Sequence, residues 1–212
     1  MDLFNKEPDL LSMTYDEVKS LAEKCQKCPL AKTRNKVVFG QGPVPCDLML
    51  IGEAPGADED AQGLPFVGRA GQLLTKILAS IDIKRPDDIY IANTLKCRPP
   101  NNRTPSAKEQ EACWPYLEAQ IKFIKPKIIL LAGSPACKQV LKSDEPMGKL
   151  RGKWTKLPGT DIAVLPVFHP SYLLRNQSKA KGSPKWLTWQ DMQEVKHALE
   201  YHRKVAELTD NL

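Results

Sequence analysis

Four short apolar runs, separated by segments with helical spacing, constrain the fold of this 212-residue chain more than any other feature. The runs are residues 47–52 (DLMLIG), 89–95 (IYIANTL), 127–132 (KIILLA) and 162–168 (IAVLPVF). We predict helices over residues 14–25, 71–81, 105–125, 134–142 and 186–204. Strands that are apolar along their length and alternate with helices indicate a parallel sheet covered on both faces. The sequence therefore predicts an α/β fold around four mainly parallel strands.

Composition excludes several classes of protein. The chain is 42% apolar and 26% charged, as an ordinary globular protein is, which argues against disorder of the whole chain. Its apolar runs fall well short of the ~20 residues that a membrane helix needs. Residues 1–7 lack the basic head and apolar core of a secretory signal. We expect a cytoplasmic monomer without membrane contact, associated with the nucleoid if its source is prokaryotic.

Positive charge is concentrated in one part of the chain. Eight basic residues and a single acid lie between Lys149 and Lys185, whereas the whole chain carries a net charge of +6. A local excess of this kind suits a polyanionic partner, although a solvated lysine-rich loop would look the same.

Four cysteines have a spacing that points to a metal centre. Cys25 and Cys28 form a C-x-x-C pair, and Cys97 and Cys113 follow much later. Disulfides are rare in the expected compartment. A structural zinc site usually shows two such pairs. Four scattered cysteines with one pair fit an iron–sulfur cluster better, because a cluster is larger and is held by cysteine alone. Zinc and a redox-active pair stay open on spacing alone.

Three loops with unusual residues follow the predicted strands. They are Gly52–Gly56 (GEAPG), Asn93 with the segment 97–102 (CRPPNN), and His169–Ser171 (HPS). In open parallel sheets, ligands bind beyond the carboxyl ends of the strands. We therefore expect these loops to meet at one edge of the sheet, although they are far apart in the sequence.

Four blocks in this order resemble the family 4 uracil-DNA glycosylases, the iron–sulfur members of the uracil-DNA glycosylase superfamily. The blocks are GEAPGADED at 52–60, LPFVGRAGQLL at 64–74, NTLKCRPPNNR at 93–103 and HPSYLLR at 169–175. The similarity extends from about Cys25 to Lys204. It implies a three-layer α/β/α fold and a [4Fe–4S] cluster on Cys25, Cys28, Cys97 and Cys113. It also implies removal of uracil from single- or double-stranded DNA, which leaves an abasic site for base excision repair.

The chemistry of base removal assigns roles within those blocks. A glycosylase flips its base into a pocket. Phe66 is the candidate to stack on the base. Asn93 can accept from uracil N3–H and donate to O4, and we expect a backbone hydrogen bond to fix its orientation. His169 is expected to donate to O2, where negative charge develops as the bond to the sugar breaks, and a neutral imidazole suffices for this.

A carboxylate that faces the sugar can orient water or balance positive charge on the deoxyribose. Glu53 is the candidate, with Asn101 as its helper, and both are expected to be catalytic. Glu59 and Asp60 compete with Glu53, but capping or loop structure explains them as well. Substrate contacts are also expected from Gly52, Ala54 and Ser171 of the matched blocks.

The segment after His169 is expected to contact DNA. Leu173 and Leu174 are candidates for an apolar wedge that fills the gap left by the flipped base, although an amphipathic turn would bury at least one of them. Arg175, Lys179 and Lys181 are expected to bind phosphates.

We predict a single glycosylase domain over residues 1–212, with its N-terminal helix tied down by the cluster cysteines. Two other functions remain. A non-catalytic nucleic-acid-binding iron–sulfur or zinc protein would explain the cysteines and the charge, but not the residues at the strand ends. A nucleotide-binding enzyme would use loop 52–56, which lacks both G-x-G-x-x-G and the lysine of a P-loop.

Overall fold

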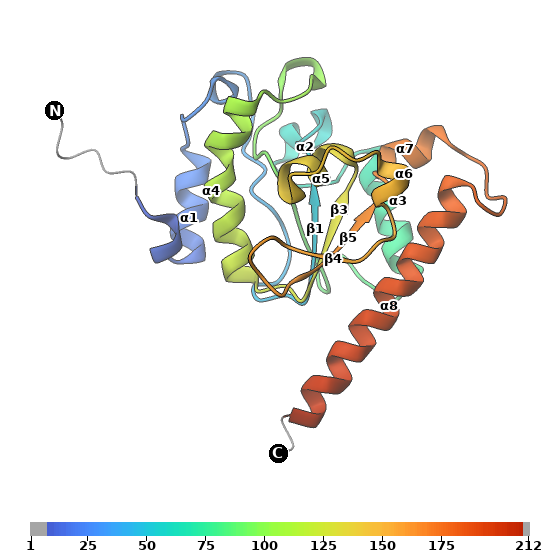
Figure 1. Cartoon of the computed structure of the whole chain (residues 1–212). Coiled ribbons are helices and arrows are strands. Elements are labelled where there is room, and N and C mark those ends of the chain that lie inside the picture. Colours follow the sequence, from blue (N-terminus) through green and yellow to red (C-terminus); the bar gives the residue numbers. More distant parts are fainter. Residues whose placement is uncertain (1–7, 210–212) are drawn as a thin grey trace.

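A computed structural model describes residues 8–209, and a five-stranded sheet in the order β2-β1-β3-β5-β4 forms its centre (Figure 1). The strands are β1 Leu48–Gly52, β2 Tyr90–Asn93, β3 Ile128–Ala132, β4 Thr155–Lys156 and β5 Ala163–Val167. The four predicted strands are present, and β1, β2, β3 and β5 are parallel. The prediction of four strands missed β4, an exposed, antiparallel edge strand of two polar residues without an apolar run.

Eight α-helices and three short 3₁₀ turns are found within residues 8–209. The helices are α1 Tyr15–Glu23, α2 Ala57–Gln62, α3 Arg69–Ala79, α4 Ala107–Ile124, α5 Ser134–Leu141, α6 Met147–Leu150, α7 Pro170–Arg175 and α8 Pro184–Thr209. The turns are η1 Leu10–Ser12, η2 Pro29–Lys32 and η3 Pro100–Asn102. The five predicted helices correspond to α1, α3, α4, α5 and α8. Sequence periodicity missed α2, because this acidic helix has no apolar stripe.

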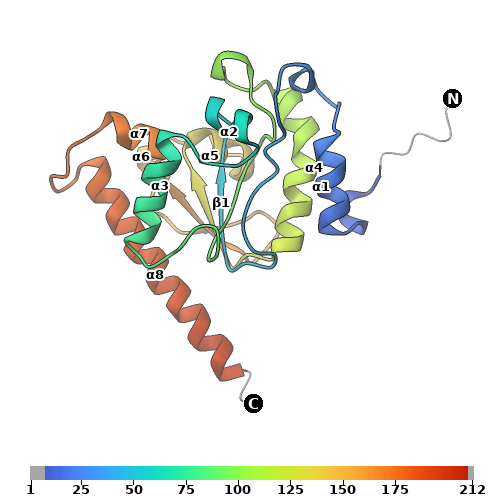
Figure 2. The ribbon, with the colours of Figure 1, turned by 180° about the vertical axis from the view of Figure 1, so that it is seen from behind.

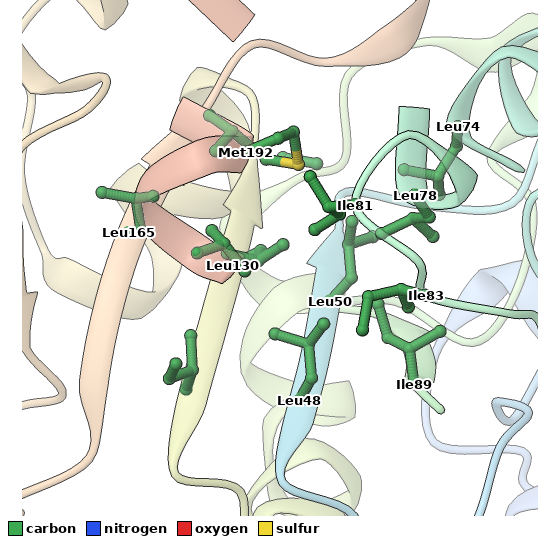
Figure 3. Packing of buried hydrophobic residues seen from close by; sticks show 14 of the residues in the cluster. Leu48, Leu50, Leu74, Leu78, Ile81, Ile83, Ile89, Leu130, Leu165 and Met192 are labelled. Carbon is green, nitrogen blue, oxygen red and sulfur yellow. The ribbon is translucent and has the colours of Figure 1, made fainter. Parts of the chain in front are cut away.

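Helices cover both faces of the sheet, as the predicted three-layer fold requires (Figure 2). On one face, Leu50 and Leu130 pack with Leu78 of α3 and Met192 of α8 (Figure 3). Strand residues of the opposite parity point to the other face, where they pack with α4 and α5. Each central strand is therefore buried on both sides, which explains its continuous apolar sequence.

A third apolar cluster joins the N-terminal segment to the body of the protein. Val18 and Ala22 of α1 pack against Tyr116 and Ala119 of α4, and Cys97 and Cys113 belong to the same cluster. Capping boxes begin both helices: Thr14 pairs with Glu17 in α1, and Ser106 pairs with Glu109 in α4.

The C-terminal helix α8 extends past the sheet in both views (Figures 1 and 2). It is longer than the predicted helix at either end. Within the described residues 8–209, no helix is both long and apolar enough to cross a bilayer; α8 is long enough at 26 residues but too polar.

Candidate active site

Gly52 and Asn93 end two neighbouring strands and face each other in the sheet. They are register partners at the carboxyl ends of β1 and β2. A Cβ atom on Gly52 would lie 2.4 Å from Oδ1 of Asn93 and 2.8 Å from Cζ of Phe66. A side chain at position 52 would therefore displace either the amide or the ring. Glycine allows Asn93 and Phe66, which are 27 positions apart, to approach the same point.

His169 reaches this place from the end of β5. The centroids of the His169 and Phe66 rings are 5.6 Å apart, with 33° between the ring planes. On its other side, the Cβ of His169 lies 3.0 Å from the position that a Cβ on Gly133 would occupy. The structure thus brings Phe66, Asn93 and His169 together at the carboxyl edge of the sheet, where the three loops were expected to meet.

Hydrogen bonds define the protonation state of His169. Its Nδ1 accepts the backbone N–H of Ser171 at 3.1 Å and lies 2.8 Å from Ser171 Oγ. Because Nδ1 is an acceptor, the proton of the neutral ring is on Nε2. Burial, followed by the positive charge of Arg175, lowers the pKa of His169 to about 4. At neutral pH, His169 is therefore an uncharged donor through Nε2.

An open cleft of about 490 Å³ lies beside His169. Its lining includes Glu53, Ser171 and Arg175, so a carboxylate, a hydroxyl and a guanidinium face the same space. Burial raises the pKa of the half-buried Glu53. The backbone carbonyl of Glu53 accepts hydrogen bonds from Thr94 Oγ1 at 2.7 Å and Leu95 N at 3.0 Å, which ties its loop to the chain that follows β2.

The cysteines of the predicted metal centre come together around a separate pocket. Cys25, Cys28, Cys97 and Cys113 all line it, and all four are free thiols. Within residues 8–209, however, no three His, Cys, Asp or Glu side chains are grouped closely enough to hold a single metal ion. Four cysteines around one space are a set of residues that could hold a metal centre.

Positive groups and N–H donors surround these sulfurs. Arg34 Nη1 donates to Cys97 Sγ at 3.4 Å, and the backbone N–H of Lys96 donates to Cys113 Sγ at 3.3 Å. Lys96 is only 2% exposed, and its Nζ donates to the carbonyl of Asn93 and to Oε1 of Gln120. No carboxylate in the described part of the chain pairs with this ammonium group. Burial lowers the pKa of Lys96 to about 8, whereas the nearby Cys113 and Cys97 favour its charged form.

Comparison with known proteins identifies the family. The family model described as the uracil DNA glycosylase superfamily matches residues 39–193. A type-4 uracil-DNA glycosylase from Thermotoga maritima is 44% identical over 80% of this chain and 86% of the relative. A type-4 enzyme from Saccharolobus solfataricus is 42% identical over 90% and 87%, respectively. A type-5 uracil-DNA glycosylase from Pyrobaculum aerophilum is 28% identical over 60% of the chain.

The chain belongs to the uracil-DNA glycosylase superfamily and to its type-4 family. The resemblance on the four sequence blocks is thereby confirmed.

Two residues that were expected in the site of this type-4 chain, Asn101 and Ala54, do not line the cleft beside His169. Asn101 is exposed on η3 and does not line the cleft. Its φ of +54° is a left-handed turn conformation that asparagine tolerates well, so turn chemistry accounts for it. Ala54 also does not line the cleft, because it packs against the N-terminal apolar cluster. Phe66 and Asn93 are themselves nearly buried and do not line this cleft either, so the roles expected of Asn101 and Ala54 stay predictions.

Leu173 is wrong as a candidate for the DNA wedge. It lies on the inner face of α7 and is 1% exposed, so the amphipathic turn that was the alternative explanation holds for it. Leu174 is half-buried, whereas Arg175, Lys179 and Lys181 are exposed. Arg175 also lines the cleft, which places a cation next to His169.

The expected backbone hydrogen bond to the Asn93 amide is not found among the described residues. The contact that the structure shows for this amide is with Gly52, whose missing side chain leaves room for Asn93 Oδ1. Glu59 and Asp60 have structural roles, as the alternative explanation by capping or loop structure predicted. Glu59 binds the backbone amides of residues 56, 67 and 68, and Asp60 binds Asn35 and the amide of Lys36.

Sequence reasoning missed Arg85 and Lys96. Arg85 precedes β2 and donates to the carbonyls of Pro65 and Phe66. Nothing in the local sequence distinguishes it from other loop arginines. Lys96 gave a weak signal: it follows an apolar strand segment and precedes a candidate cysteine ligand, a position where lysine is rarely buried.

Proposed function

We propose that Phe66, Asn93 and His169 bind the uracil that is flipped out of DNA. As a member of the type-4 family, this chain removes uracil from DNA. The reaction hydrolyses the N-glycosidic bond and leaves an abasic site, the first step of base excision repair. The observation that carries this assignment is the environment of Gly52, against which the Asn93 amide and the Phe66 ring both pack.

The base would lie over one face of Phe66. The 5.6 Å between the Phe66 and His169 centroids is less than the roughly 7 Å needed to sandwich a base at a stacking spacing of about 3.4 Å on each side. His169 must therefore meet the base at its edge. Asn93, next to the same ring, then faces N3 and O4 of uracil, and cytosine presents the opposite donor and acceptor pattern to this amide.

His169 would stabilise the departing base. As the bond to the sugar breaks, negative charge develops on the uracil oxygens, and the Nε2–H of His169 is the donor available for O2. A donor aimed at developing charge lowers the energy of the transition state more than that of the bound substrate. Ser171 supports this role through the backbone N–H that holds Nδ1 as an acceptor.

Glu53 would face the sugar from the adjacent wall of the cleft. Its carboxylate can orient the attacking water and balance the positive charge that develops on the deoxyribose. Because burial raises the pKa of Glu53, its carboxylate is a stronger base than an exposed one. It therefore accepts a proton from water more readily.

The pH dependence of excision should reveal Glu53. Because burial raises its pKa above 4.5, lowering the pH protonates Glu53 first and removes the negative charge that the sugar requires. His169, with a pKa of about 4, protonates later. We expect single-turnover rates to fall below an apparent pKa higher than 4.5. In Glu53→Gln, the remaining activity should lose this step. An unchanged profile in Glu53→Gln would contradict the role of Glu53.

DNA would approach along the exposed basic segment. Arg175, Lys179 and Lys181 follow the cleft residue His169 and can bind phosphates on either side of the flipped nucleotide. Leu174, half-buried at the same helix, is the remaining wedge candidate. We propose that a monomer acts on both single- and double-stranded DNA, since phosphate contacts of this kind exist in both.

A [4Fe–4S] cluster on Cys25, Cys28, Cys97 and Cys113 would have a structural role. Cleavage of a glycosidic bond by water transfers no electrons, so the chemistry that the group supplies is a set of bonds that link distant segments. These bonds would connect the segment after α1, the chain after β2 and helix α4 within one glycosylase domain over residues 1–212. Cys97 is four residues from Asn93, so the site and the metal centre share one loop.

Replacement of Asn93 tests the base-reading role. We expect Asn93→Ala to slow uracil release roughly 10- to 100-fold, since a bidentate contact to a base is worth about 1–3 kcal/mol. The measurement is single-turnover release of uracil from single- and double-stranded DNA. Asn102→Ala, which changes an exposed asparagine on the separate turn η3, is the control. A wild-type rate in Asn93→Ala would exclude Asn93 as the residue that reads uracil.

A further inference from the structure

The turn that carries Phe66 has an unusual backbone conformation. Phe66 has a φ of +52°, in the left-handed region that bulky side chains rarely adopt. Phe66 is nevertheless only 6% exposed, and its ring packs against Gly52 at the edge of the core, so a strained backbone places this side chain beside Asn93. Strain of this kind persists only where neighbouring groups hold the backbone in place.

Arg85 holds the carbonyl side of this turn. Its Nη1 donates to the Phe66 carbonyl at 2.9 Å, and its Nη2 donates to the Pro65 carbonyl at 2.8 Å. The same guanidinium reaches Thr75 Oγ1 at 3.2 Å and the Gly71 carbonyl at 3.4 Å, both in α3. Only the planar fork of arginine can bind two neighbouring carbonyls in this way.

Glu59 holds the amide side of the same turn. Its Oε1 accepts the backbone N–H groups of Val67 at 2.9 Å and Gly68 at 3.0 Å. Its Oε2 accepts the N–H of Gly56 at 3.1 Å, which connects the turn to the loop after β1. Four successive residues, 65–68, thus present carbonyls to a cation and then amides to an anion.

Close packing leaves this turn little freedom. A Cβ atom on Gly71 would lie 1.7 Å from the Phe66 carbonyl oxygen, so the first turn of α3 is in direct contact with the strained peptide. The contacts of Arg85 and Glu59 with residues 65–68 are all to the backbone of the turn.

We propose that Arg85 and Glu59 are positioning residues that together hold Phe66 in its left-handed conformation and so set the plane on which uracil stacks. This inference rests on the proposed stacking role of Phe66. Without the two charged side chains, the peptide at Phe66 would relax toward an ordinary conformation and turn the ring away from Gly52 and Asn93. The bound base would then lose its alignment with His169 and Glu53.

A double-mutant cycle between Arg85 and Phe66 tests the proposal. We expect Arg85→Met to lower the single-turnover rate of uracil release roughly tenfold, because small misplacement of an aligned group is enough to slow chemistry. Affinity for DNA without uracil should change less than twofold. Arg85→Lys should recover only part of the loss, since a single ammonium cannot bind both carbonyls. In a Phe66→Ala background, Arg85→Met should cost less than twofold further.

Two further variants distinguish a specific effect on the turn from a general loss of structure. Lys127→Met removes a cation paired with Asp47 near the opposite edge of the sheet and should keep the wild-type rate. If Arg85→Met fails to fold, Glu59→Gln replaces it in the cycle, because a glutamine oxygen cannot accept all three amides. The inference would be overturned if the double variant lost the product of the two single losses in rate. It would also be overturned if Arg85→Met kept the wild-type rate while Phe66→Ala was slow. A wild-type rate in Phe66→Ala would instead overturn the stacking role itself.

Discussion

We expect His169→Ala to slow uracil release roughly 100- to 1,000-fold, the usual effect of removing one donor that stabilises developing negative charge. The loss should fall on the chemical step, because charge on O2 grows only as the glycosidic bond breaks. Binding of uracil-containing DNA should change little, since phosphate contacts supply most of the affinity. Single-turnover kinetics with excess enzyme, together with equilibrium DNA binding, separate these two effects.

The protonation state of His169 sharpens this prediction. Nδ1 accepts the backbone N–H of Ser171, and burial lowers the pKa to about 4, so the ring is neutral near pH 7. The wild-type rate should therefore show no histidine titration near pH 6.5, the ordinary pKa of this side chain. His202→Ala, in the distal part of α8, serves as the control and should behave as wild type. A loss smaller than tenfold in His169→Ala would contradict the assignment of His169 as the donor to O2.

Cys97→Ala is expected to lower iron content, stability and uracil release together. Removal of one ligand should release the proposed cluster and loosen the loop that Cys97 shares with Asn93, four residues earlier. Loss of a cross-link between distant segments typically costs about 3 kcal/mol. For a chain of this size, that corresponds to a fall in Tm of roughly 10 °C. Iron per chain, the visible spectrum, thermal unfolding and uracil release measure these effects on one preparation.

Cys137→Ala provides a matched control for the metal centre. Cys137 is also a buried free thiol, but it lies in α5, packs in the apolar cluster on the other face of the sheet and does not line the pocket of the other four cysteines. We expect it to retain iron and activity. A Cys97→Ala protein with full activity and no iron would show that the cluster does not hold the site. Stoichiometric zinc in the wild-type protein would exclude an iron–sulfur cluster.

Most of the fold could be predicted because its signals are local. The central strands are buried on both faces, so each had to be a continuous apolar run, and the capping residues Thr14 and Ser106 mark the starts of α1 and α4. The strand β4 and helix α2 carry no such pattern. The two residues of β4 are exposed, and α2 is held by contacts from distant loops, so only the folded chain specifies these elements.

The candidate site could be predicted where it depends on strand ends. Parallel strands place their carboxyl ends at one edge, and this rule alone brought Gly52, Asn93 and His169 to the same place. The errors have a different origin. Leu173 and Leu174 are adjacent in the sequence, and only the packing of α7 determines that the first is buried. The anchoring of Phe66 by Arg85 likewise joins segments that share no pattern.

The sequence by itself determined the order of strands and helices, the edge at which ligand loops gather and the residue types available for base recognition. These follow from burial, backbone geometry and hydrogen-bonding capacity, which are properties of single residues and short spacings. Tertiary structure alone decided the left-handed turn of Phe66, the burial that lowers the pKa of His169 and the burial of Lys96. Each of these depends on a partner brought close by the fold, so the free energy that maintains it exists only once the chain has folded.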